Sequence, residues 1–289
     1  MPELPEVETI KNGLNKLIIN KTVASVSYDW PKSFPNSKSD YKSFLIESRV
    51  ELVRRRAKVL IVNLSSQYSL VIHLKMTGQL VYKDKKTRFG AGHPNRSLIG
   101  KLPDKSTRVT VSFDDGSKLF FNDQRKFGWM RLMPTIEIEN LDFFKRVGPE
   151  PLSDNVNWKV LRDRFKRKKN SSIKASLLDQ SVLAGIGNIY ADESLWGAKI
   201  HPAILVGTLK DKDYQTLYKE IVNVLNLSIS LGGSTDKNYI DAEGKKGSYL
   251  AFAKVFRKEG LPCPRCGHTI IKTRVANRGT HLCPHCQRR

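Results

Sequence analysis

Four cysteines near the end of the chain constrain its fold more than any other feature of the sequence. They form the pairs CPRC at 263–266 and CPHC at 283–286, so the spacing is C-x2-C-x16-C-x2-C. In a zinc ribbon of this spacing, two tight knuckles bring four thiolates into one tetrahedral, structural site. We therefore predict that the segment 253–289 is a zinc finger that needs one structural zinc ion to fold. The predicted ligands are Cys263, Cys266, Cys283 and Cys286.

The cysteines have one competing interpretation, two unrelated pairs of reduced surface thiols. It is disfavoured because no other cysteine occurs in the chain. Three histidines lie near the knuckles, but four thiolates already satisfy zinc, so we interpret these histidines as bystanders. They are His268, His281 and His285. Four clustered thiols also make a poor disulfide framework for 289 residues, which indicates a reducing compartment.

The remaining residues of this module indicate what it binds. Between the knuckles, TIIKTRVANRGTHL predicts two short strands around a turn at 277–279, with Arg278 at its tip. From 257 to 289 there are eight Lys or Arg residues and one acidic residue, Glu259. A basic hairpin of this kind suits nucleic acid, although a zinc ribbon taken alone is also typical of protein contacts.

The charge of the whole chain predicts a polyanionic partner. Fifty Lys and Arg residues against 28 Asp and Glu give a formal net charge of +22. Hydrophobic residues make up 39%, which is too many for a disordered basic tail. The apolar runs, such as VLIVNL at 59–64, are far shorter than the roughly 18 residues of a spanning helix, and the start lacks a secretory-signal pattern. We therefore expect a folded, cytoplasmic protein with no membrane association.

The sequence divides near its middle. Two prolines and a glycine interrupt the helical pattern in VGPEPLSDN at 147–155. We place a linker at 141–157, between an N-terminal domain over 1–140 and a helical domain over 158–252.

The helical domain is basic and contains a candidate phosphate site. Residues 158–174 include eight Lys or Arg and one Asp. Further on, Gly-Ile-Gly-Asn at 185–188 indicates a turn into a helix capped by Asn188, and the free N–H groups of a helix start bind phosphate. For this motif alone an ordinary capped helix is the simpler interpretation. The polar, glycine-rich stretch 231–252 predicts a loop that is either functional or disordered.

The N-terminal domain has the pattern of an antiparallel β structure. Period-two runs such as SLVIHLKMTGQL and RVTVSFDDGSKLFF predict hairpins, the second with an Asp-Gly turn. By alternation Met76 belongs to a core face, but the Thr-Gly directly after it also allows a position at a strand tip. Arg125 and Phe127 point the same way if NDQRKFG is extended. Such a pair can wedge into a base stack, although a core Phe beside a surface Arg is commoner.

The first residues predict both a helix and a reactive group. In MPELPEVETI, Pro5 suits the first turn of a helix. That helix does not account for Pro2 and Glu3 ahead of it. Removal of Met1, usual before proline, leaves a secondary α-amine whose pKa lies about 2.5 units below that of lysine. Such an amine can attack a sugar C1′ and form an iminium ion, while the Glu3 carboxyl moves protons.

These features occur together in one known family. The chain resembles formamidopyrimidine-DNA glycosylase from residue 2 to residue 286. The resemblance implies an α+β fold, with an antiparallel β-sandwich and an N-terminal helix, then a helix-two-turn-helix domain with a four-cysteine zinc finger. It rests on seven strings that follow in order: PELPEVET, RRRAK, HLKMTG, NDQRKFG, GPEPL, LLDQSVLAGIGNIYADESLW and the four-cysteine ribbon.

The resemblance also implies an activity. The family excises oxidised purines, namely 8-oxoguanine and formamidopyrimidines, in base excision repair, and nicks the abasic strand by β,δ-elimination. By motif, Pro2 is the Schiff-base nucleophile and Glu3 the proton donor. Lys58 donates a proton for β-elimination and Arg278 one for δ-elimination. The stretch 231–252 resembles the loop that closes over the damaged base.

The resemblance further implies how the chain holds DNA. Met76, Arg125 and Phe127 fill the void left by the flipped base, and Lys169 and Asn188 bind backbone phosphates. The partner is then damaged double-stranded DNA, bound by a monomer associated with the nucleoid.

The sequence departs from the family pattern at one DNA contact. Many members carry a His-x-His pair just before the strand that matches RVTVSF, whereas this chain reads Ser106, Thr107 and Arg108 there. A DNA-contacting histidine is therefore missing. The segment 83–104 looks longer than its usual counterpart, and His93 within it is our candidate for the lost contact.

Two alternatives remain open. An endonuclease VIII type of glycosylase removes oxidised pyrimidines, but its start usually reads PEGPE, whereas this chain has Leu4. A non-catalytic zinc-finger protein would bind DNA without cutting it, and the combination of Pro2, Glu3 and Lys58 argues against that alternative.

Overall fold

The protein forms two compact units in the computed structural model. The first is Met1–Lys145 with Leu231–Ser248, and the second is Arg146–Ser230 with Tyr249–Arg289. The first consists mainly of antiparallel strands and the second mainly of helices, so the predicted α+β class is confirmed. The finer division into four parts stays a prediction. The structure describes residues 2–93, 95–234 and 249–289.

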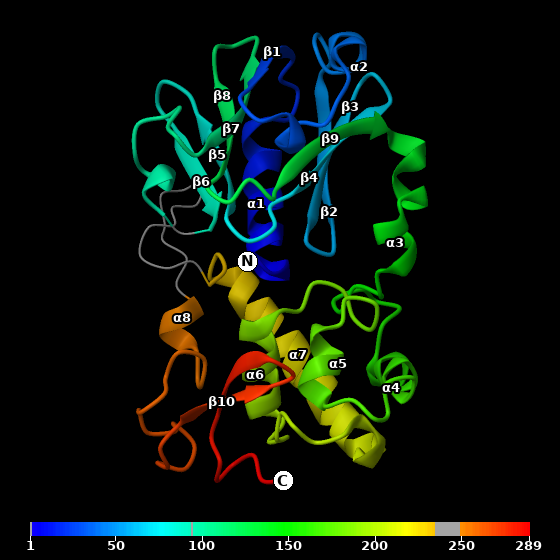
Figure 1. Cartoon of the computed structure of the whole chain (residues 1–289), viewed down its shortest axis with the longest axis vertical. Helices are drawn as coiled ribbons and strands as arrows, with labels where there is room; N and C mark the ends of the chain where they lie inside the picture. Colours follow the sequence, from blue (N-terminus) through cyan, green and yellow to red (C-terminus); the bar gives the residue numbers. More distant parts are fainter. Residues whose placement is uncertain (1, 94, 235–248) are drawn as a thin grey trace. The chain divides into compact units, whose positions relative to one another are not determined.

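Two antiparallel sheets form the first unit (Figure 1). The strands are β1 (Val23–Tyr28), β2 (Val50–Arg56), β3 (Val59–Leu64), β4 (Tyr68–His73), β5 (Gly78–Lys83), β6 (Arg88–Gly92), β7 (Thr107–Phe113), β8 (Lys118–Asp123) and β9 (Trp129–Pro134). One sheet has the order β1-β7-β8-β5-β6 and the other β2-β3-β4-β9. Buried hydrophobic side chains of both sheets share one core, so the sheets are the two layers of a sandwich.

Helix α1 (Leu4–Leu17) fixes the start of the chain to this sandwich. It packs against β2 and β6, which belong to different sheets, and Figure 1 shows it between them. Pro5 lies in its first turn, and Val7, Ile10 and Leu14 are fully buried, which confirms the predicted helix. A Cβ atom on Gly13 would lie 2.4 Å from the Phe89 ring, so the close approach of α1 to β6 requires glycine.

The run SLVIHLKMTGQL divides between the two sheets. Strand β4 ends at His73 in one sheet, and β5 begins at Gly78 in the other. Met76 therefore lies in the connecting loop with 41% of its surface exposed, which excludes the core interpretation. A Cβ atom on Gly78 would lie 2.3 Å from the Leu74 carbonyl oxygen, so the tight turn requires glycine there. The Asp-Gly turn between β7 and β8 forms as predicted, with Gly116 at φ +81°.

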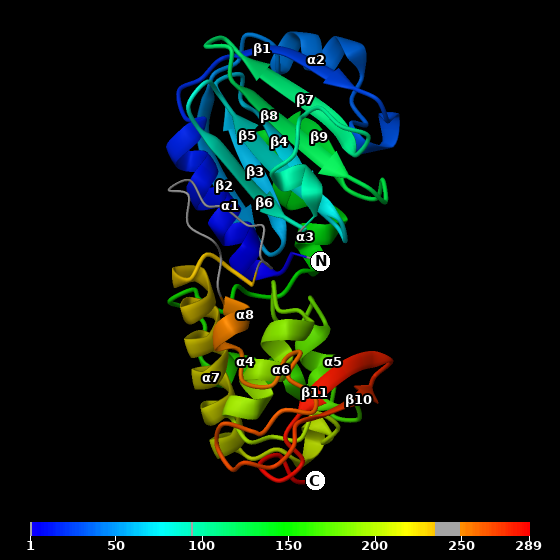
Figure 2. The same cartoon turned by 90° about the vertical axis from the view of Figure 1, so that its left-hand side faces the viewer.

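The second unit packs short helices around one long helix. Its elements are α4 (Trp158–Lys166), α5 (Ile173–Leu178), α6 (Asn188–Gly197), α7 (Asp211–Ser230), α8 (Tyr249–Phe252), β10 (Ile271–Val275) and β11 (Arg278–Leu282). Helix α6 lies between α7 and the β10–β11 hairpin (Figure 2). Within the described ranges, no helix has the length and apolarity needed to cross a membrane.

Shorter helical segments complete both units. They are α2 (Lys38–Phe44), α3 (Asp142–Arg146), η1 (Pro31–Ser33), η2 (Arg96–Leu98), η3 (Thr135–Asn140) and η4 (Val206–Thr208).

Candidate active site and zinc centre

The predicted nucleophile lies at a buried helix start. Pro2 and Glu3 are both buried, and Glu3 is the N-cap of α1 with an extended backbone. The N–H of Glu3 donates to Oε2 of Glu6 over 2.8 Å, which is the reciprocal bond of a capping box. The cap therefore fixes the direction in which the first residues leave the helix. Met1 lies outside the described residues.

The second oxygen of Glu6 binds a segment that is distant in the sequence. Oε1 accepts from the N–H of Ser234 over 2.7 Å. Gly233 adopts φ +88°, and a Cβ atom there would lie 3.2 Å from the same oxygen. One buried carboxylate therefore holds both Glu3 and the start of the predicted base-binding loop. The rest of that loop, 235–248, lies outside the described residues.

Lys58 lies at the turn between β2 and β3 and is 5% exposed. This turn and the start of α1 lie at the same end of the sandwich (Figure 1). The neighbouring strand pairs Val59 with His73. Burial, helped by the charges of Lys75 and Lys58, lowers the pKa of His73 to about 3, so its ring is neutral. We did not select His73 from the sequence, although it begins the HLKMTG string.

A buried aspartate organises the predicted void-filling residues. Both oxygens of Asp123 accept backbone N–H groups, Oδ1 from Arg125 at 3.2 Å and Oδ2 from Phe127 at 2.8 Å. Oδ1 also accepts from the hydroxyl of Thr77, the residue after Met76. Asp123 thus joins the loop after β4 to the loop after β8.

The side chains on these two loops are presented to solvent. The guanidinium carbon of Arg125 lies 4.8 Å from the centre of the Phe127 ring, so the two point the same way, as predicted. Phe127 is 54% exposed, which excludes the core interpretation for it as well. Three side chains able to contact bases therefore project from a rigid double loop: Met76, Arg125 and Phe127.

His93 and the residues at the missing histidine pair have different surroundings. Arg108 is 5% exposed, donates to the Asp123 carbonyl over 3.0 Å, and pairs with Asp29, so it serves the fold. His93 directly follows β6, and its N–H donates to the Gly78 carbonyl over 3.0 Å. Its ring is half-buried, and burial lowers the pKa of His93.

In the second unit, Arg278 lies beside the hairpin turn rather than at its tip. The turn residues are Ala276 and Asn277, with φ values of 51° and 60°, and Arg278 begins β11 opposite Val275. The predicted turn was therefore wrong by about one residue, because two consecutive positive φ angles were not expected at Ala-Asn. Arg278 is exposed.

Asn188 and Lys169 also differ from the sequence-based expectation. The N-cap of α6 is Gly187, and Asn188 is its first helical residue, so the predicted Asn cap was wrong. The Asn188 amide instead donates to the Gly279 carbonyl over 3.0 Å, next to Arg278. Lys169 lies between α4 and α5, and its side chain is exposed.

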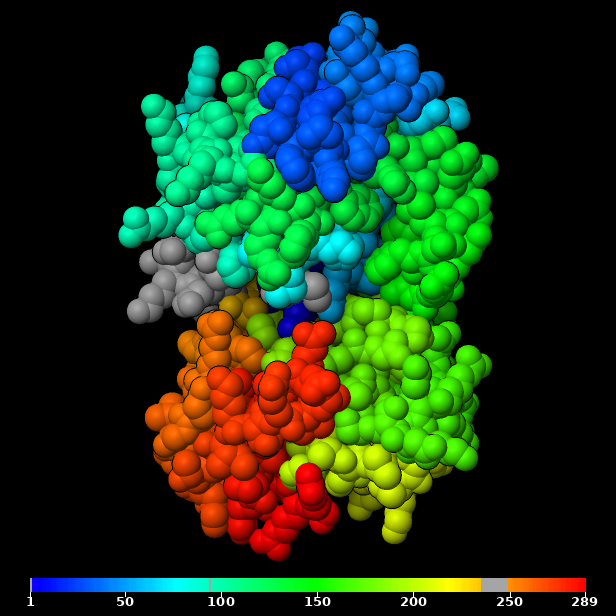
Figure 3. Space-filling model, viewed as in Figure 1, coloured from blue at the N-terminus to red at the C-terminus, as the bar shows by residue number. Residues whose placement is uncertain are grey.

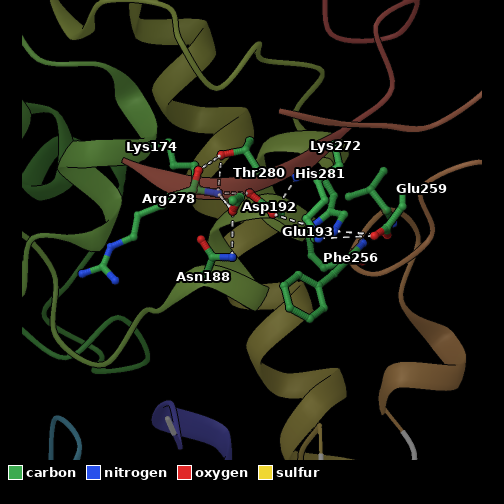
Figure 4. Close-up of polar contacts among 12 residues, drawn as sticks. Lys174, Asn188, Asp192, Glu193, Phe256, Glu259, Lys272, Arg278, Thr280 and His281 are labelled. Atoms are coloured by element: carbon green, nitrogen blue, oxygen red, sulfur yellow. Dashed lines mark hydrogen bonds and ion pairs between the residues drawn. The ribbon is translucent and has the colours of Figure 1, made fainter. Parts of the chain in front are cut away.

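A buried ion pair holds the Arg278 turn (Figure 4). Lys174 and Asp192 are both fully buried, with Nζ and Oδ1 2.7 Å apart. Nζ also donates to the Gly279 carbonyl at 2.9 Å and to the Thr280 hydroxyl at 2.7 Å. The other Asp192 oxygen accepts from the N–H of His281 over 2.9 Å. The sequence count of eight Lys or Arg over 158–174 includes Lys174 without distinguishing it from the others, because a basic helical pattern does not reveal a buried partner.

A second buried acid fixes the entrance to the zinc module. Glu193 accepts backbone N–H groups from Lys254, Val255 and Phe256 at 2.8 to 2.9 Å. Burial raises the pKa of Glu193, and these three donors act against that rise.

The four cysteines fit a structural zinc ion. The Sγ atoms of Cys263 and Cys286 are 4.0 Å apart, and those of Cys266 and Cys283 are 3.5 Å apart. Tetrahedral zinc with bonds of about 2.3 Å places its sulfur ligands about 3.8 Å from one another. The predicted set of four ligands is thus brought together. The segment that carries them is drawn in orange and red in Figure 3.

Known proteins match the chain over its whole length. Three family models match in order: the formamidopyrimidine-DNA glycosylase N-terminal domain over residues 1–130, its H2TH domain over 147–239, and the zinc finger found in FPG and IleRS over 260–289. A formamidopyrimidine-DNA glycosylase of Pediococcus pentosaceus is 39% identical over 287 residues, covering 99% of each chain.

Solved structures agree with these matches. A Lactococcus lactis FPG mutant in complex with DNA that contains Fapy-dG is 33% identical, with a TM-score of 0.87 and full coverage of both chains. A complex of Lactococcus lactis Fpg with DNA that contains an abasic site has the same identity and TM-score, and covers 99% of this chain and 100% of that one.

Proposed function

Because the chain belongs to the formamidopyrimidine-DNA glycosylase family, we propose that it excises oxidised purines from DNA and cuts the strand at the abasic site. The observation that carries this proposal is the buried placement of Pro2 and Glu3 at the start of α1, in a chain that also has the four-cysteine centre. The enzyme is thus a DNA glycosylase with lyase activity in base excision repair.

The first step is nucleophilic attack by Pro2. With Met1 removed, the lone pair of the proline nitrogen forms a bond to C1′, and the base leaves with the electrons of the glycosidic bond and takes up a proton. Glu3 moves protons at this step and during opening of the sugar ring. The nitrogen loses its proton and the product is an iminium ion, which withdraws electrons from the sugar.

Strand cleavage follows from the iminium ion. Loss of a proton from C2′ converts the iminium into an enamine. The enamine electrons then form a C2′=C3′ double bond, expel the 3′-phosphate oxygen with the electrons of the C3′–O bond and regenerate the iminium, which is β-elimination. A second elimination breaks the C5′–O bond, and water finally releases the sugar fragment from the enzyme. We assign Lys58 as the proton donor for the first elimination and Arg278 for the second.

The exposed residues of the first unit serve base extrusion. Met76, Arg125 and Phe127 fill the space that the flipped base leaves, which offsets the few kcal/mol that unstacking costs. Their support by Asp123 favours this role, because a wedge must be rigid to hold a base out of the stack. His93 contacts DNA as a neutral N–H donor in place of the missing histidine pair, since burial lowers its pKa.

The second unit binds the DNA backbone. Lys169 neutralises one phosphate. Asn188 contacts another phosphate at the N-terminus of α6, where backbone N–H groups are available. Its side-chain amide already donates to the Gly279 carbonyl. The zinc ion stabilises the fold of the hairpin and takes no part in the reaction. Its ligands are Cys263, Cys266, Cys283 and Cys286. The protein acts as a monomer on damaged double-stranded DNA, and we place it at the nucleoid.

Borohydride trapping tests the proposed function. We expect a covalent complex with duplex DNA that contains 8-oxoguanine, and much less with a duplex that contains an oxidised pyrimidine. A reversed preference would identify an endonuclease VIII type of enzyme. Binding without any trapped complex would identify a non-catalytic DNA-binding protein.

A further inference from the structure

A second group of metal-binding side chains lies outside the four-cysteine centre. The ligand atoms of Cys266, His268 and His285 all lie within 4.8 Å of one another. The two imidazole rings stack with their centres 4.0 Å apart and their planes 10° apart. Both histidines are exposed, whereas Cys266 is half-buried. We interpreted these histidines above as bystanders, and their common position with Cys266 calls for another explanation.

The knuckles themselves hold the two histidines in place. Gly267, at φ +76°, donates its N–H to the Cys263 carbonyl over 2.9 Å. The Cys263 N–H in turn donates to the His268 carbonyl over 2.8 Å, which fixes the backbone of that histidine. His285 lies inside the other knuckle, between two cysteines. Each knuckle therefore presents one imidazole outside the thiolates, and the fold that assembles the first site also assembles the second group.

The imidazole nitrogens are available to a cation. Among the described residues, no hydrogen bond or ion pair engages the imidazole nitrogens of His285, whose backbone carbonyl accepts from Nε of Arg288 over 3.2 Å. The His268 ring has only a 3.4 Å contact from Nδ1 to the Cys266 carbonyl. A cation bound at ordinary zinc distances needs its ligand atoms about 3.3 to 3.6 Å apart. The two stacked rings must therefore turn out of their parallel arrangement for their nitrogen lone pairs to converge on one ion, and the exposure of both side chains leaves room for that rotation. One zinc ion with four thiolates carries a net charge of −2, which offsets part of the positive charge that Arg288 and the other basic residues place around the two imidazoles.

We propose that Cys266, His268 and His285 form a second site for a divalent cation, outside the structural centre and sharing the Cys266 thiolate with it. Two imidazoles and one bridging thiolate suit zinc, cobalt, nickel or copper rather than magnesium or calcium. Because the second cation touches a ligand of the first, the site is the route by which zinc exchanges with the structural centre. This inference does not depend on the proposed enzymatic function.

The test uses the full-length protein loaded with one zinc ion per chain. We expect a second equivalent of zinc to bind in native mass spectrometry and in equilibrium dialysis. In the H268N/H285N double variant it should not bind, because only the shared thiolate remains. The matched control is His201→Asn, which removes a half-buried imidazole that does not belong to the group. The control should bind the second equivalent as the parent does.

Exchange with isotopically enriched zinc gives an independent readout. We expect the double variant to exchange its structural zinc at least about tenfold more slowly than the parent, a rise of about 1.4 kcal/mol in the barrier to exchange, because the route through the two imidazoles is lost. Zinc content and circular dichroism show whether the double variant folds. If the double variant does not fold, the single variants H268N and H285N are tested in its place. A parent protein that binds only one zinc ion in excess metal would overturn the proposal. So would a double variant that binds and exchanges as the parent does.

Discussion

The two units hold their functional side chains in different ways. In the first unit, the carboxylates of Glu6 and Asp123 accept hydrogen bonds from backbone N–H groups. Glu6 thereby fixes the start of α1, and Asp123 fixes the loop that carries Arg125 and Phe127. In the second unit, the turn of Arg278 depends on the buried pair of Lys174 and Asp192 and on a metal centre. The first arrangement needs only the chain itself, whereas the second also needs an ion. Attack by Pro2 and the zinc-dependent part of DNA binding should therefore be separable by mutation.

Blocking the amine of Pro2 should have the largest effect. A protein that retains Met1 or carries an N-terminal tag has an amide nitrogen there, with a delocalised lone pair. We expect excision and nicking to be lost, with affinity for an 8-oxoguanine duplex unchanged because the second unit is intact. Borohydride trapping and equilibrium binding measure the two properties. Full activity in a protein that mass spectrometry shows to keep Met1 would refute the amine mechanism.

A variant of Glu3 sharpens this result. Glu3→Gln keeps the amine and removes a proton donor, so base excision should fall sharply. Cleavage of a ready-made abasic site should partly survive, because no base has to leave there. Equal losses on both duplexes would contradict the assigned role of Glu3.

Loss of the zinc ion should affect the second unit alone. In Cys283→Ser the hairpin loses a stabilisation on the order of 10 kcal/mol, which is typical of structural zinc. We expect affinity for damaged duplex to fall at least about 100-fold, corresponding to two lost charge-assisted contacts. The thermal transition of the first unit should persist in calorimetry. A chelator should reproduce the effect on the parent protein, and added zinc should reverse it; unchanged affinity would contradict the assigned role of the module.

Breaking the buried ion pair should be costly without removing any metal ligand. Lys174→Met leaves the carboxylate of Asp192 buried without its cation, so the unfolding free energy of the second unit should fall by about 3 to 5 kcal/mol. Lys168→Met is the matched control, because it breaks a half-exposed pair with Asp179 and should cost below about 1 kcal/mol. Urea unfolding measures the free energy of unfolding of both variants. Equal losses would show that burial does not determine how much an ion pair contributes to stability.

The pH dependence of stability should reveal His73 in the first unit. Its pKa is about 3 in the folded protein and near 6.5 when unfolded. Between these values the unfolded chain binds a proton that the folded one does not, so stability is complete above pH 6.5 and falls as the pH is lowered. The loss reaches up to about 4 kcal/mol near pH 3. His73→Gln should remove this part of the acid sensitivity in urea titrations at several pH values; an unchanged pH profile would contradict a buried neutral ring.

The smallest effect is expected within the wedge. Phe127→Ala should slow excision from duplex DNA about tenfold, equivalent to about 1.4 kcal/mol of lost support for the flipped base. Cleavage at a pre-formed abasic site should change less, since no base needs to be held out there. Ile136→Ala is the control, because it trims a side chain that is 87% exposed in the same unit. A loss that is equal on both substrates would indicate a folding defect.

Sequence reasoning succeeded where the signal is local. Cysteine spacing predicted the metal centre, helical spacing predicted α1, and two-residue spacing predicted that Arg125 and Phe127 point the same way. These patterns depend on neighbours within a few turns of one chain segment.

Sequence reasoning failed where contacts between distant segments of the chain determine the position of a side chain. The contact between Glu6 and Ser234 joins residues 228 positions apart, and no periodicity reports it. Lys174 looks like one more surface charge until the fold buries it against Asp192 and the hairpin. Asn188 has the residue type of a cap, yet it lies one residue inside α6, and its Nδ2 donates to the hairpin carbonyl of Gly279. Buried polar partners are therefore the part of the site that only the tertiary structure supplies.

The carboxylate of Glu6 has a consequence for the order of assembly during synthesis. Helix α1 leaves the ribosome first, but Ser234 follows 228 residues later, so for most of translation Oε1 of Glu6 lacks the Ser234 N–H donor. The start of α1, with Pro2 and Glu3, is thus synthesised first but gains its contact with Ser234 last. Stalled nascent chains that end before residue 231 should consequently leave the α1 start more open to protease than chains that extend beyond residue 234.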